Sequence, residues 1–348
     1  MDKIKLTEFS HGAGCGCKIS PAQLETILKG AKTGLGSFPN LLVGNDSKDD
    51  AAVLDMGNGQ ALISTTDFFM PIVDDGFDFG RIASVNAISD VYAMGGKPIL
   101  AIAILGWPIS KIPLEIASQV IEGARSICAE VGIPLAGGHS IDSPEPIFGL
   151  AVNGMVPLHQ IKRNNQAKPD SLLYLTKSLG VGILSTAMKK GILKDLDFKF
   201  MLDSMTQLNR LGEKLGELSY VNALTDITGF GLLGHLLELC EGSGVHAEID
   251  FNSIPLLPNL SYYLDLASYP GGTSRNWDSY GSKINPISNH QKYILADPQT
   301  SGGLLISIDE VEKENFENFL KSEGFSNLAP IGKLVSPNNA FPIIVEGS

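Results

Sequence analysis

Two thiols and an ammonium group lie close together near the start of the chain, in the run His11-Gly12-Ala13-Gly14-Cys15-Gly16-Cys17-Lys18. The three glycines of this run oppose a stable helix and leave the backbone free to adopt positive φ, which predicts a mobile arm that closes over a ligand. A free cysteine titrates at about 8.5, and a neighbouring lysine favours the nucleophilic thiolate. The run therefore predicts reactive sulfur at Cys15 or Cys17.

Two other interpretations fit the same run. A disordered terminus could carry two cysteines that have no function. Zinc binding fits less well, because Cys-x-Cys is spaced too tightly for a usual zinc ligand pair and no second pair follows it.

Carboxylates stand at the expected ends of strands and on one expected helix. Lys48-Asp49-Asp50 comes directly before an expected strand at residues 51–54, and Thr65-Thr66-Asp67 ends the next strand. Asn86 and Asp90 are four residues apart and therefore share one face of a helix. Paired acids at the edge of a sheet suit a hard cation.

A further acid, Asp226, comes shortly before Thr228-Gly229-Phe230-Gly231, where the backbone N–H groups of a helix start could receive an anion. Because Mg2+ prefers carboxylates, phosphate oxygens and water, Asp50, Asp90 and Asp226 are the candidate magnesium ligands. Each acid also has a purely structural interpretation. Asp226 suits a turn or a helix cap, Asp90 a solvated helix position, and Asp50 an ordinary turn.

His139, between Gly138 and Ser140, is another candidate for chemistry. A single histidine in a glycine turn is more typical of a hydrogen-bonding structural residue than of a catalytic base. The chain contains no Gly-x4-Gly-Lys-Ser/Thr run, and Gly96-Lys97-Pro98 fails in both spacing and final hydroxyl. Any nucleotide site is therefore not a P-loop.

Composition limits the class of protein. With 348 residues and 43% hydrophobic residues, the chain predicts two packed domains. The net charge of −12 argues against nucleic acid as a partner, although divalent cations would let an acidic protein bind nucleotide phosphates. The four cysteines are too few for a disulfide framework, and no apolar run is long enough for a membrane span. We therefore expect a cytoplasmic protein that does not contact a membrane.

The order of expected elements indicates a mixed α/β fold in two halves. The first half contains a helix opened by Ser20-Pro21 and then strands and helices at residues 51–54, 61–65, 78–94, 99–105, 113–131, 133–136 and 148–156. The polar, basic stretch 157–170 is the expected linker. The second half contains elements at residues 172–176, 182–190, 200–218, 230–240 and 245–250, then a polar loop at 269–289 and a final helix with strands.

Several segments together resemble the selenophosphate synthetase family, also called selenide, water dikinase. They are residues 11–21, 45–53, 64–71, 86–98, 136–146, 225–235 and 297–304, so the match runs almost from end to end. The run Gly-Ala-Gly-Cys-Gly-Cys-Lys is specific to that family. Asp-Asp-Ala-Ala and Thr-Gly-Phe-Gly are also similar to the wider ATP-binding superfamily of aminoimidazole ribonucleotide synthetase.

The resemblance implies an aminoimidazole ribonucleotide synthetase-like fold of two α/β (α+β) domains, with mixed sheets and flanking helices. The implied parts are a mobile Cys/Lys arm at residues 1–20, an N-terminal ATP- and metal-binding and dimerisation domain at 21–157, and a C-terminal domain at 168–348. It also implies a homodimer with ATP between the domains. The implied reaction converts selenide, ATP and water to selenophosphate, AMP and orthophosphate, supplying activated selenium for selenocysteine and selenouridine.

Roles carry over to the matching positions. Cys15 matches the reactive residue, and Lys18 matches an essential cation that contacts the ATP phosphates. Asp50, Asp90 and Asp226 match the magnesium ligands. Nucleotide-contacting positions are matched by Lys18, Ser47, Lys48, Asp49, Asp67, Asp90, Gly138, His139 and Ser140. Four points stay open: K+ as a further cofactor, a selenium-delivery protein as a partner, the role of Cys17, and whether Cys15 bonds selenium covalently.

Two alternative functions would give different results in biochemical assays. A sister enzyme of the same superfamily would use ATP to activate an amide, carboxylate or phosphate ester, would turn ATP over without selenide, and would not need Cys15. A non-catalytic thiol carrier or ATP-sensing protein would bind nucleotide or selenium without producing AMP.

Overall fold

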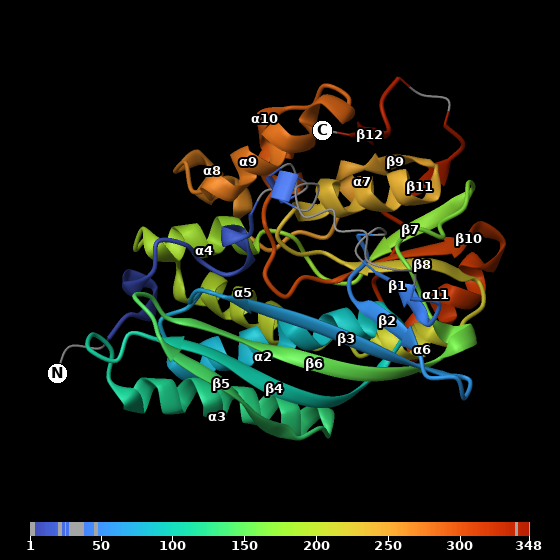
Figure 1. The fold of residues 1–348 in the computed structure, drawn as a ribbon. Coiled ribbons are helices and arrows are strands. Elements are labelled where there is room, and N and C mark those ends of the chain that lie inside the picture. The colour runs from blue at the N-terminus through green and yellow to red at the C-terminus, as the bar shows by residue number, and fades with distance from the viewer. Residues whose placement is uncertain are drawn as a thin grey trace.

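The computed structural model describes residues 4–19, 23–24, 26–27, 38–44, 48–337 and 340–347. Within these residues the chain forms two six-stranded sheets, each accompanied by helices (Figure 1). The predicted mixed α/β fold in two halves is confirmed. None of the helices in this described part is long and apolar enough to cross a membrane.

The N-terminal sheet has the strand order β1-β2-β3-β6-β4-β5, with β4 and β5 parallel and the other neighbours antiparallel. Its strands are β1 (Leu41–Val43), β2 (Ala52–Asp55), β3 (Gln60–Phe69), β4 (Lys97–Trp107), β5 (Leu135–Asp142) and β6 (Ile147–Pro157). Along β3, Ala61 and Ile63 are buried whereas Ser64 and Thr66 are exposed. This alternation is typical of a sheet with one covered face.

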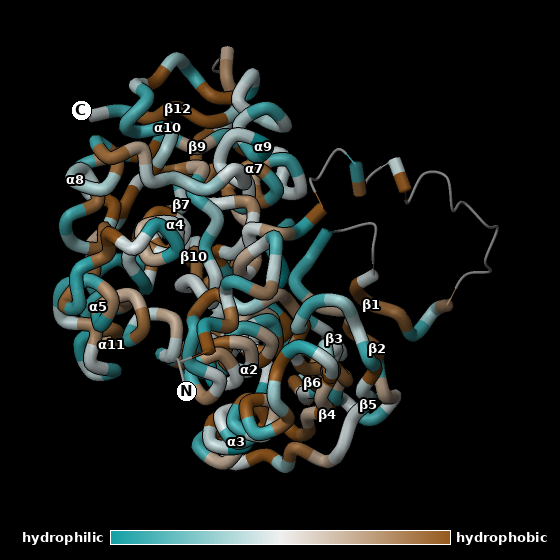
Figure 2. The backbone as a smooth tube through the Cα atoms, turned by 90° about the vertical axis from the view of Figure 1, so that its left-hand side faces the viewer, coloured by the Kyte–Doolittle hydropathy of each residue, from teal (hydrophilic) through white to brown (hydrophobic). Residues whose placement is uncertain are grey.

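Helices α2 (Gly76–Ala93) and α3 (Leu114–Val131) pack against each other beside this sheet. The side chain of Asp75 caps α2 by accepting a hydrogen bond from the Asp78 N–H at 3.0 Å. Helix α2 contacts β3 and β6 on one side and elements of the C-terminal half on the other, so it is buried almost all round (Figure 2). Polar side chains on α2 therefore lie between the two halves of the molecule.

The C-terminal sheet has the order β12-β9-β11-β7-β10-β8. Its strands are β7 (Ser171–Leu175), β8 (Val221–Asp226), β9 (His246–Asp250), β10 (Leu304–Asp309), β11 (Gly332–Val335) and β12 (Ile343–Glu346). The α-helices of this half are α4 (Val181–Lys189), α5 (Asp195–Thr206), α6 (Leu211–Gly216), α7 (Gly231–Ser243), α8 (Leu260–Asp265), α9 (Gly271–Tyr280), α10 (Asn289–Leu295) and α11 (Lys313–Ser322).

Three predicted elements differ from the structure. Residues 200–218, predicted as one helix, contain the end of α5 and the separate helix α6. Residues 269–289, predicted as a loop, contain α9, which is anchored because the buried Asn276 amide donates to the carbonyls of Gly229 and Ala296. The strand predicted at 133–136 is β5, which continues through the glycines that were expected to form a turn. The predicted start of a helix at Ser20-Pro21 lies outside the described residues.

Candidate active site

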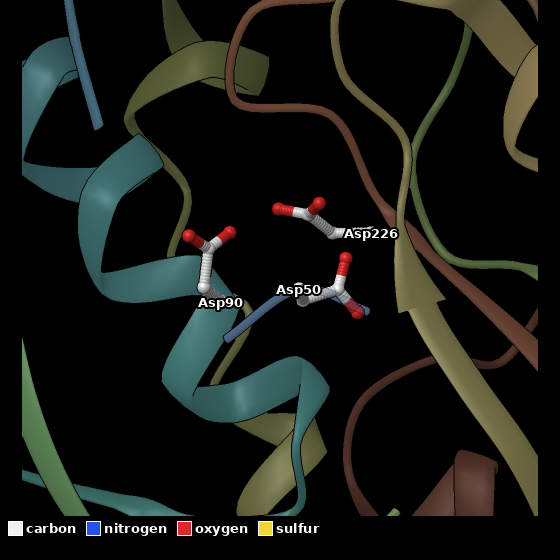
Figure 3. Close-up of side chains that lie close together, drawn as sticks. All are labelled: Asp50, Asp90 and Asp226. Atoms are coloured by element: carbon white, nitrogen blue, oxygen red, sulfur yellow. The ribbon is translucent and has the colours of Figure 1, made fainter. Parts of the chain in front are cut away.

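Three carboxylates meet between the two halves of the molecule. Asp50 lies just before β2, Asp90 is on α2, and Asp226 ends β8. One oxygen from each lies within 4.8 Å of the others, and the three side chains converge on one space (Figure 3). The structure therefore brings together the three acids that the sequence singled out, from elements far apart in the chain.

Neighbouring hydroxyl and amide groups fix these acids. Thr65 of β3 donates its hydroxyl to Asp90 Oδ2 at 2.5 Å, and Thr225 donates to Asp50 Oδ1 at 2.8 Å. One turn before Asp90 on α2, the Asn86 amide donates to Asp67 Oδ2 at 2.6 Å. The polar helix face predicted for Asn86 and Asp90 is thus packed against β3 and is not solvated.

Burial and mutual repulsion make this cluster costly without a cation. Burial, with Asp226 next in effect, raises the pKa of Asp50 well above its usual value, and burial together with Asp67 does the same for Asp90. Burial raises the pKa of Asp226 to about 6. Among the described residues, Asp50 Oδ2 and Asp226 Oδ2 are buried without a hydrogen-bond partner. An oxygen-only donor set with unpaired buried carboxylate atoms fits a hard divalent cation such as Mg2+.

The run at residues 11–18 is seated between the two halves. The Cys15 N–H donates to Thr300 Oγ1 at 2.9 Å, and the Cys15 thiol donates to Asn86 Oδ1 at 3.3 Å. Two cations of the C-terminal half hold the backbone on either side, since Lys189 donates to the Gly12 carbonyl at 2.7 Å and Arg275 donates to the Gly16 carbonyl at 2.9 Å. The structure thus shows the arm closed.

This seating corrects two predictions about Cys15. The run was expected to form a mobile arm, yet Cys15 is only 1% exposed and joins the buried apolar cluster. Lysine was expected to lower the pKa of the thiol. Burial instead raises the pKa of Cys15 above its usual range and outweighs the opposing effect of Lys18. The closed arrangement therefore holds a protonated thiol.

Lys18 joins the arm to the acidic cluster. Its ammonium lies 3.5 Å from Asp67 Oδ1, and Asp67 is also the acceptor for Asn86. Desolvation lowers the pKa of Lys18, but the carboxylate of Asp67, followed by Cys15 and Asp90, raises it above its usual value. Lys18 is therefore a permanent cation beside the carboxylates.

The residues expected to contact nucleotide before β2 lie next to the cluster. Lys48 is exposed and has a φ of 51°, an uncommon conformation outside glycine. Asp49 Oδ1 accepts hydrogen bonds at 3.2 Å from the N–H groups of Asp50 and Asn164, and burial raises the pKa of Asp49 to about 6. Ser47 lies outside the described residues.

The other three residues expected to contact nucleotide, Gly138, His139 and Ser140, lie away from the acidic cluster. They are exposed residues of β5, the edge strand, and β6 and β4 separate that strand from β3. His139 pairs in register with Ile104 on β4. Within one chain, the structure does not bring these three residues to the acidic cluster.

Sequence reasoning missed the part of the site formed by residues 300–301. Thr300 receives the Cys15 N–H, and Ser301 donates its own N–H to Asn86 Oδ1 at 2.8 Å. Ser301 is fully buried and has a φ of 54°, so its backbone is held in an uncommon conformation at the point where the arm docks. The sequence signal was the polar pair before Gly302-Gly303, within the segment 297–304 that carries the family resemblance but to which no role was assigned.

Comparison with protein families identifies the class. The family model "AIR synthase related protein, N-terminal domain" matches residues 48–156, and "AIR synthase related protein, C-terminal domain" matches residues 168–344. Together the fold and these matches define an AIR synthase related protein.

Similar curated proteins narrow the assignment. Selenide, water dikinase from Aeromonas hydrophila subsp. hydrophila is 59% identical over 99% of this chain and 100% of its own length. Selenide, water dikinase from Colwellia psychrerythraea is 58% identical over 97% of each chain. The chain therefore belongs to the selenide, water dikinase family.

Solved structures share the fold at much lower identity. The structure described as AaThiL complexed with AMPPCP and TMP has a TM-score of 0.67 and 17% identity, covering 94% of each chain. Hydrogenase maturation protein HypE in complex with ATP has a TM-score of 0.66 and 19% identity, covering 89% of this chain and 87% of its own. At these identities the likeness shows the fold alone.

Proposed function

We propose that this protein makes selenophosphate from selenide, ATP and water, with release of AMP and orthophosphate. The observation that carries the proposal is the docking of the Cys15–Lys18 run onto an acidic cluster built from both halves of a chain that belongs to the selenide, water dikinase family. The product would supply activated selenium for selenocysteine and selenouridine.

In this proposal the ATP phosphates bind where Asp50, Asp90 and Asp226 meet, through Mg2+. The fit rests on the oxygen-only donor set and on the two buried oxygens that have no partner among the described residues. Bound Mg2+ would neutralise and orient phosphate oxygens, which carry most of the charge in phosphoryl transfer. Lys48 and Asp49 lie beside the cluster and are proposed to contact the nucleotide, and Ser47 is proposed with them from its position in the sequence.

Residues of the arm have the other roles in the proposed reaction. Lys18 places a positive charge beside Asp67, where it would offset the repulsion between anionic selenide and the γ-phosphate. The closed arm buries Cys15, which excludes water during the first transfer. Water must reach the site afterwards, because ADP is then cleaved to AMP. Opening of the arm at Cys15–Lys18 would admit it.

We also propose a homodimer formed through the N-terminal sheet. One face of this sheet holds Thr65 and Asp67 against α2, whereas the opposite face carries exposed apolar side chains. Phe68 is 52% exposed and is in register with Gly149 of β6, which in turn pairs with Ile104. Other exposed apolar side chains of this sheet are Leu41, Leu54, Ile99, Ile102 and Ile141. An apolar sheet face of this kind suits a second copy of the same chain.

The dimer gives a role to β5. Residues 138–140 lie on the edge strand beside this exposed face, so a second copy that covers the face would contact them. We propose that Gly138, His139 and Ser140 contact nucleotide only in the dimer. Crosslinking of the wild type and of Phe68→Glu would test the interface. The proposal requires that the charged variant lose the crosslinked dimer.

The proposed domains are an arm at residues 1–20, an N-terminal domain at 21–157 and a C-terminal domain at 168–348. Each domain contains one six-stranded sheet, and the two family matches end and begin on either side of residues 157–167. The four cysteines are free thiols, which supports a reducing location such as the cytoplasm.

The reaction is tested by 31P NMR of the purified protein with ATP, Mg2+ and selenide under anaerobic reduction. The proposal predicts selenophosphate and AMP in equal amounts, and neither of them without selenide. ATP turnover that does not depend on selenide would instead support a sister enzyme of the same superfamily. Binding of ATP or selenide without AMP would support a carrier or sensor.

A further inference from the structure

A small cavity lies beside the docked arm, on the side of the C-terminal domain. Cys15 and Lys18 of the arm line it together with Gly229, Gly272, Arg275 and Asn276. Its volume is about 10 Å³, which is the scale of a group with a single heavy atom. A phosphate group, with five heavy atoms, is larger than this volume.

The charge around this cavity is positive. Lys18 and Arg275 bring two cations, of which Lys18 also pairs with Asp67 at 3.5 Å, and none of the described residues that line the cavity is Asp or Glu. Arg275 donates one N–H to the Gly16 carbonyl. Because a guanidinium has five N–H donors, others are left to bind an anion. The cavity therefore offers charged donors to an anion.

Two helices add to this charge. Gly229 lies two residues before α7 (Gly231–Ser243), and Gly272 is in the first turn of α9 (Gly271–Tyr280). Both helices thus present their N-terminal ends toward the cavity, where the helix dipole is positive and backbone N–H groups are free of intrahelical partners. Two helix ends and two cations around a single-atom space select a small anion.

The same glycines let the arm close over the cavity. A Cβ atom at Gly229 would lie 2.7 Å from the Cys15 carbonyl oxygen and 3.1 Å from Lys18 Cδ. At Gly272 a Cβ atom would lie 3.3 Å from the Gly16 carbonyl oxygen. Any side chain at these positions would press on the arm backbone. The cavity is therefore completed only when the arm is seated.

We propose that this cavity binds the chalcogenide substrate as a small anion with one heavy atom, hydroselenide or hydrosulfide, and that Arg275 is a binding residue for it. This inference rests on the proposed function. The anion would lie beside Cys15 and Lys18, and the arm would enclose it as it docks. Because the cavity is smaller than a phosphate group, the proposal places selenide apart from the ATP phosphates.

The kinetic test compares Arg275→Gln with Lys189→Gln. Both residues donate to a carbonyl of the arm, but only Arg275 lines the cavity. Loss of a charged hydrogen bond should raise the KM for selenide about tenfold or more in Arg275→Gln, with the Kd for Mg-ATP unchanged. Lys189→Gln should leave the KM for selenide within about twofold. The proposal is overturned if the two variants behave alike, or if the KM for selenide does not change in Arg275→Gln.

A binding test does not depend on turnover. Bromide has the charge of hydroselenide and a similar size, and it can be located by anomalous diffraction from crystals of the closed wild-type protein soaked in bromide. The proposal predicts a peak between Lys18 and Arg275 that is lost in Arg275→Gln. Absence of that peak in the wild type would contradict the site even if selenophosphate is formed. A peak with no selenophosphate would instead count against the proposed reaction and leave the anion site standing.

Discussion

The acidic cluster and the docked arm are both buried, but different kinds of structure hold them in place. Asp90 and Asp226 are on regular elements, α2 and β8, whereas Cys15 is on a short glycine-rich segment fixed by a few hydrogen bonds from distant residues. Burial raises the pKa in both places. The difference indicates that the cluster is ready for a cation whether or not the arm is closed, while the thiol can change its surroundings when the arm leaves.

Mutations in the two regions should therefore have different effects. Cys15→Ser is expected to abolish selenophosphate formation, because the arm loses its only fully buried thiol, while serine can still donate to Asn86 Oδ1. Cys17→Ser is the matched control and should be milder, since the Cys17 thiol donates only to the Gly14 carbonyl of the arm itself. Product formation by 31P NMR and melting temperature are the measurements. Equal loss in both variants would indicate a shared structural or metal site.

Removal of one charge from the cluster should act on the cation and not on the arm. Asp226→Asn keeps the size of the side chain, and we expect turnover to fall by about 100-fold at the Mg2+ concentration that saturates the wild type. Unfolding of the ligand-free protein should change little, because Asp226 Oδ2 is buried without a hydrogen-bond partner and the substitution breaks no bond at that oxygen. A titration of activity against Mg2+ measures this effect. An unchanged Mg2+ requirement would remove the C-terminal domain from the metal site.

Lys18 links the two regions and should couple them. If it contacts the ATP phosphates, loss of a charged hydrogen bond of ~1.5 to 3 kcal/mol should weaken arm closure about tenfold or more in Lys18→Ala. We expect Mg-ATP to slow alkylation of Cys15 and proteolysis of the arm in the wild type but not in this variant. Equal protection in both proteins would confine Lys18 to the chemical step.

The charge of the cluster also predicts a dependence on pH. The pKa of Asp226 rises from 3.8 to about 6 on folding, so its stabilising contribution is full below pH 3.8 and is lost as the pH rises through about 6. The ligand-free protein should therefore lose roughly a few degrees of melting temperature between pH 5 and 7.5. Asp226→Asn should show a smaller loss. Mg2+ should stabilise the wild type more at pH 7.5, because protons compete for the carboxylates below that pH.

The smallest effect should come from the seat of the arm. Thr300→Val removes the acceptor for the Cys15 N–H but keeps the side-chain shape. One neutral hydrogen bond contributes ~1 kcal/mol, so alkylation of Cys15 should become about fivefold faster without ligand. The same threonine-to-valine change at Thr186, whose hydroxyl bonds within its own helix, is the control. No change at Thr300 would show that the other contacts hold the arm.

Local rules were sufficient to predict the acidic cluster but not the seat of the arm. Strand ends and the four-residue spacing on a helix place Asp50 and Asp90 correctly, because these rules depend on regular geometry. The burial of Cys15 depends on Thr300, which is 285 residues away in the chain, and no local pattern contains that contact. Helix α9 was missed for a similar reason, since tertiary hydrogen bonds of Asn276 stabilise a segment of weak helix propensity.

Strand β5 marks another limit of local patterns. The two glycines Gly137 and Gly138 suggested a turn. Their φ values are 116° and 153°, yet pairing with β4 continues the strand through them. The edge position also separates His139 from the cluster within one chain. Only the sheet order reveals this separation, because sequence order places β5 directly after α3 and gives no information on its neighbours.

The most direct test of separate roles for the two regions is a calorimetric titration of Mg-ATP into Cys15→Ser and Asp226→Asn. We predict that Cys15→Ser binds Mg-ATP with the affinity of the wild type, although it forms no selenophosphate, and that Asp226→Asn loses most of that affinity. Weak binding by Cys15→Ser, or unchanged binding by Asp226→Asn, would contradict the account, because the thiol and the cation site would then not be independent.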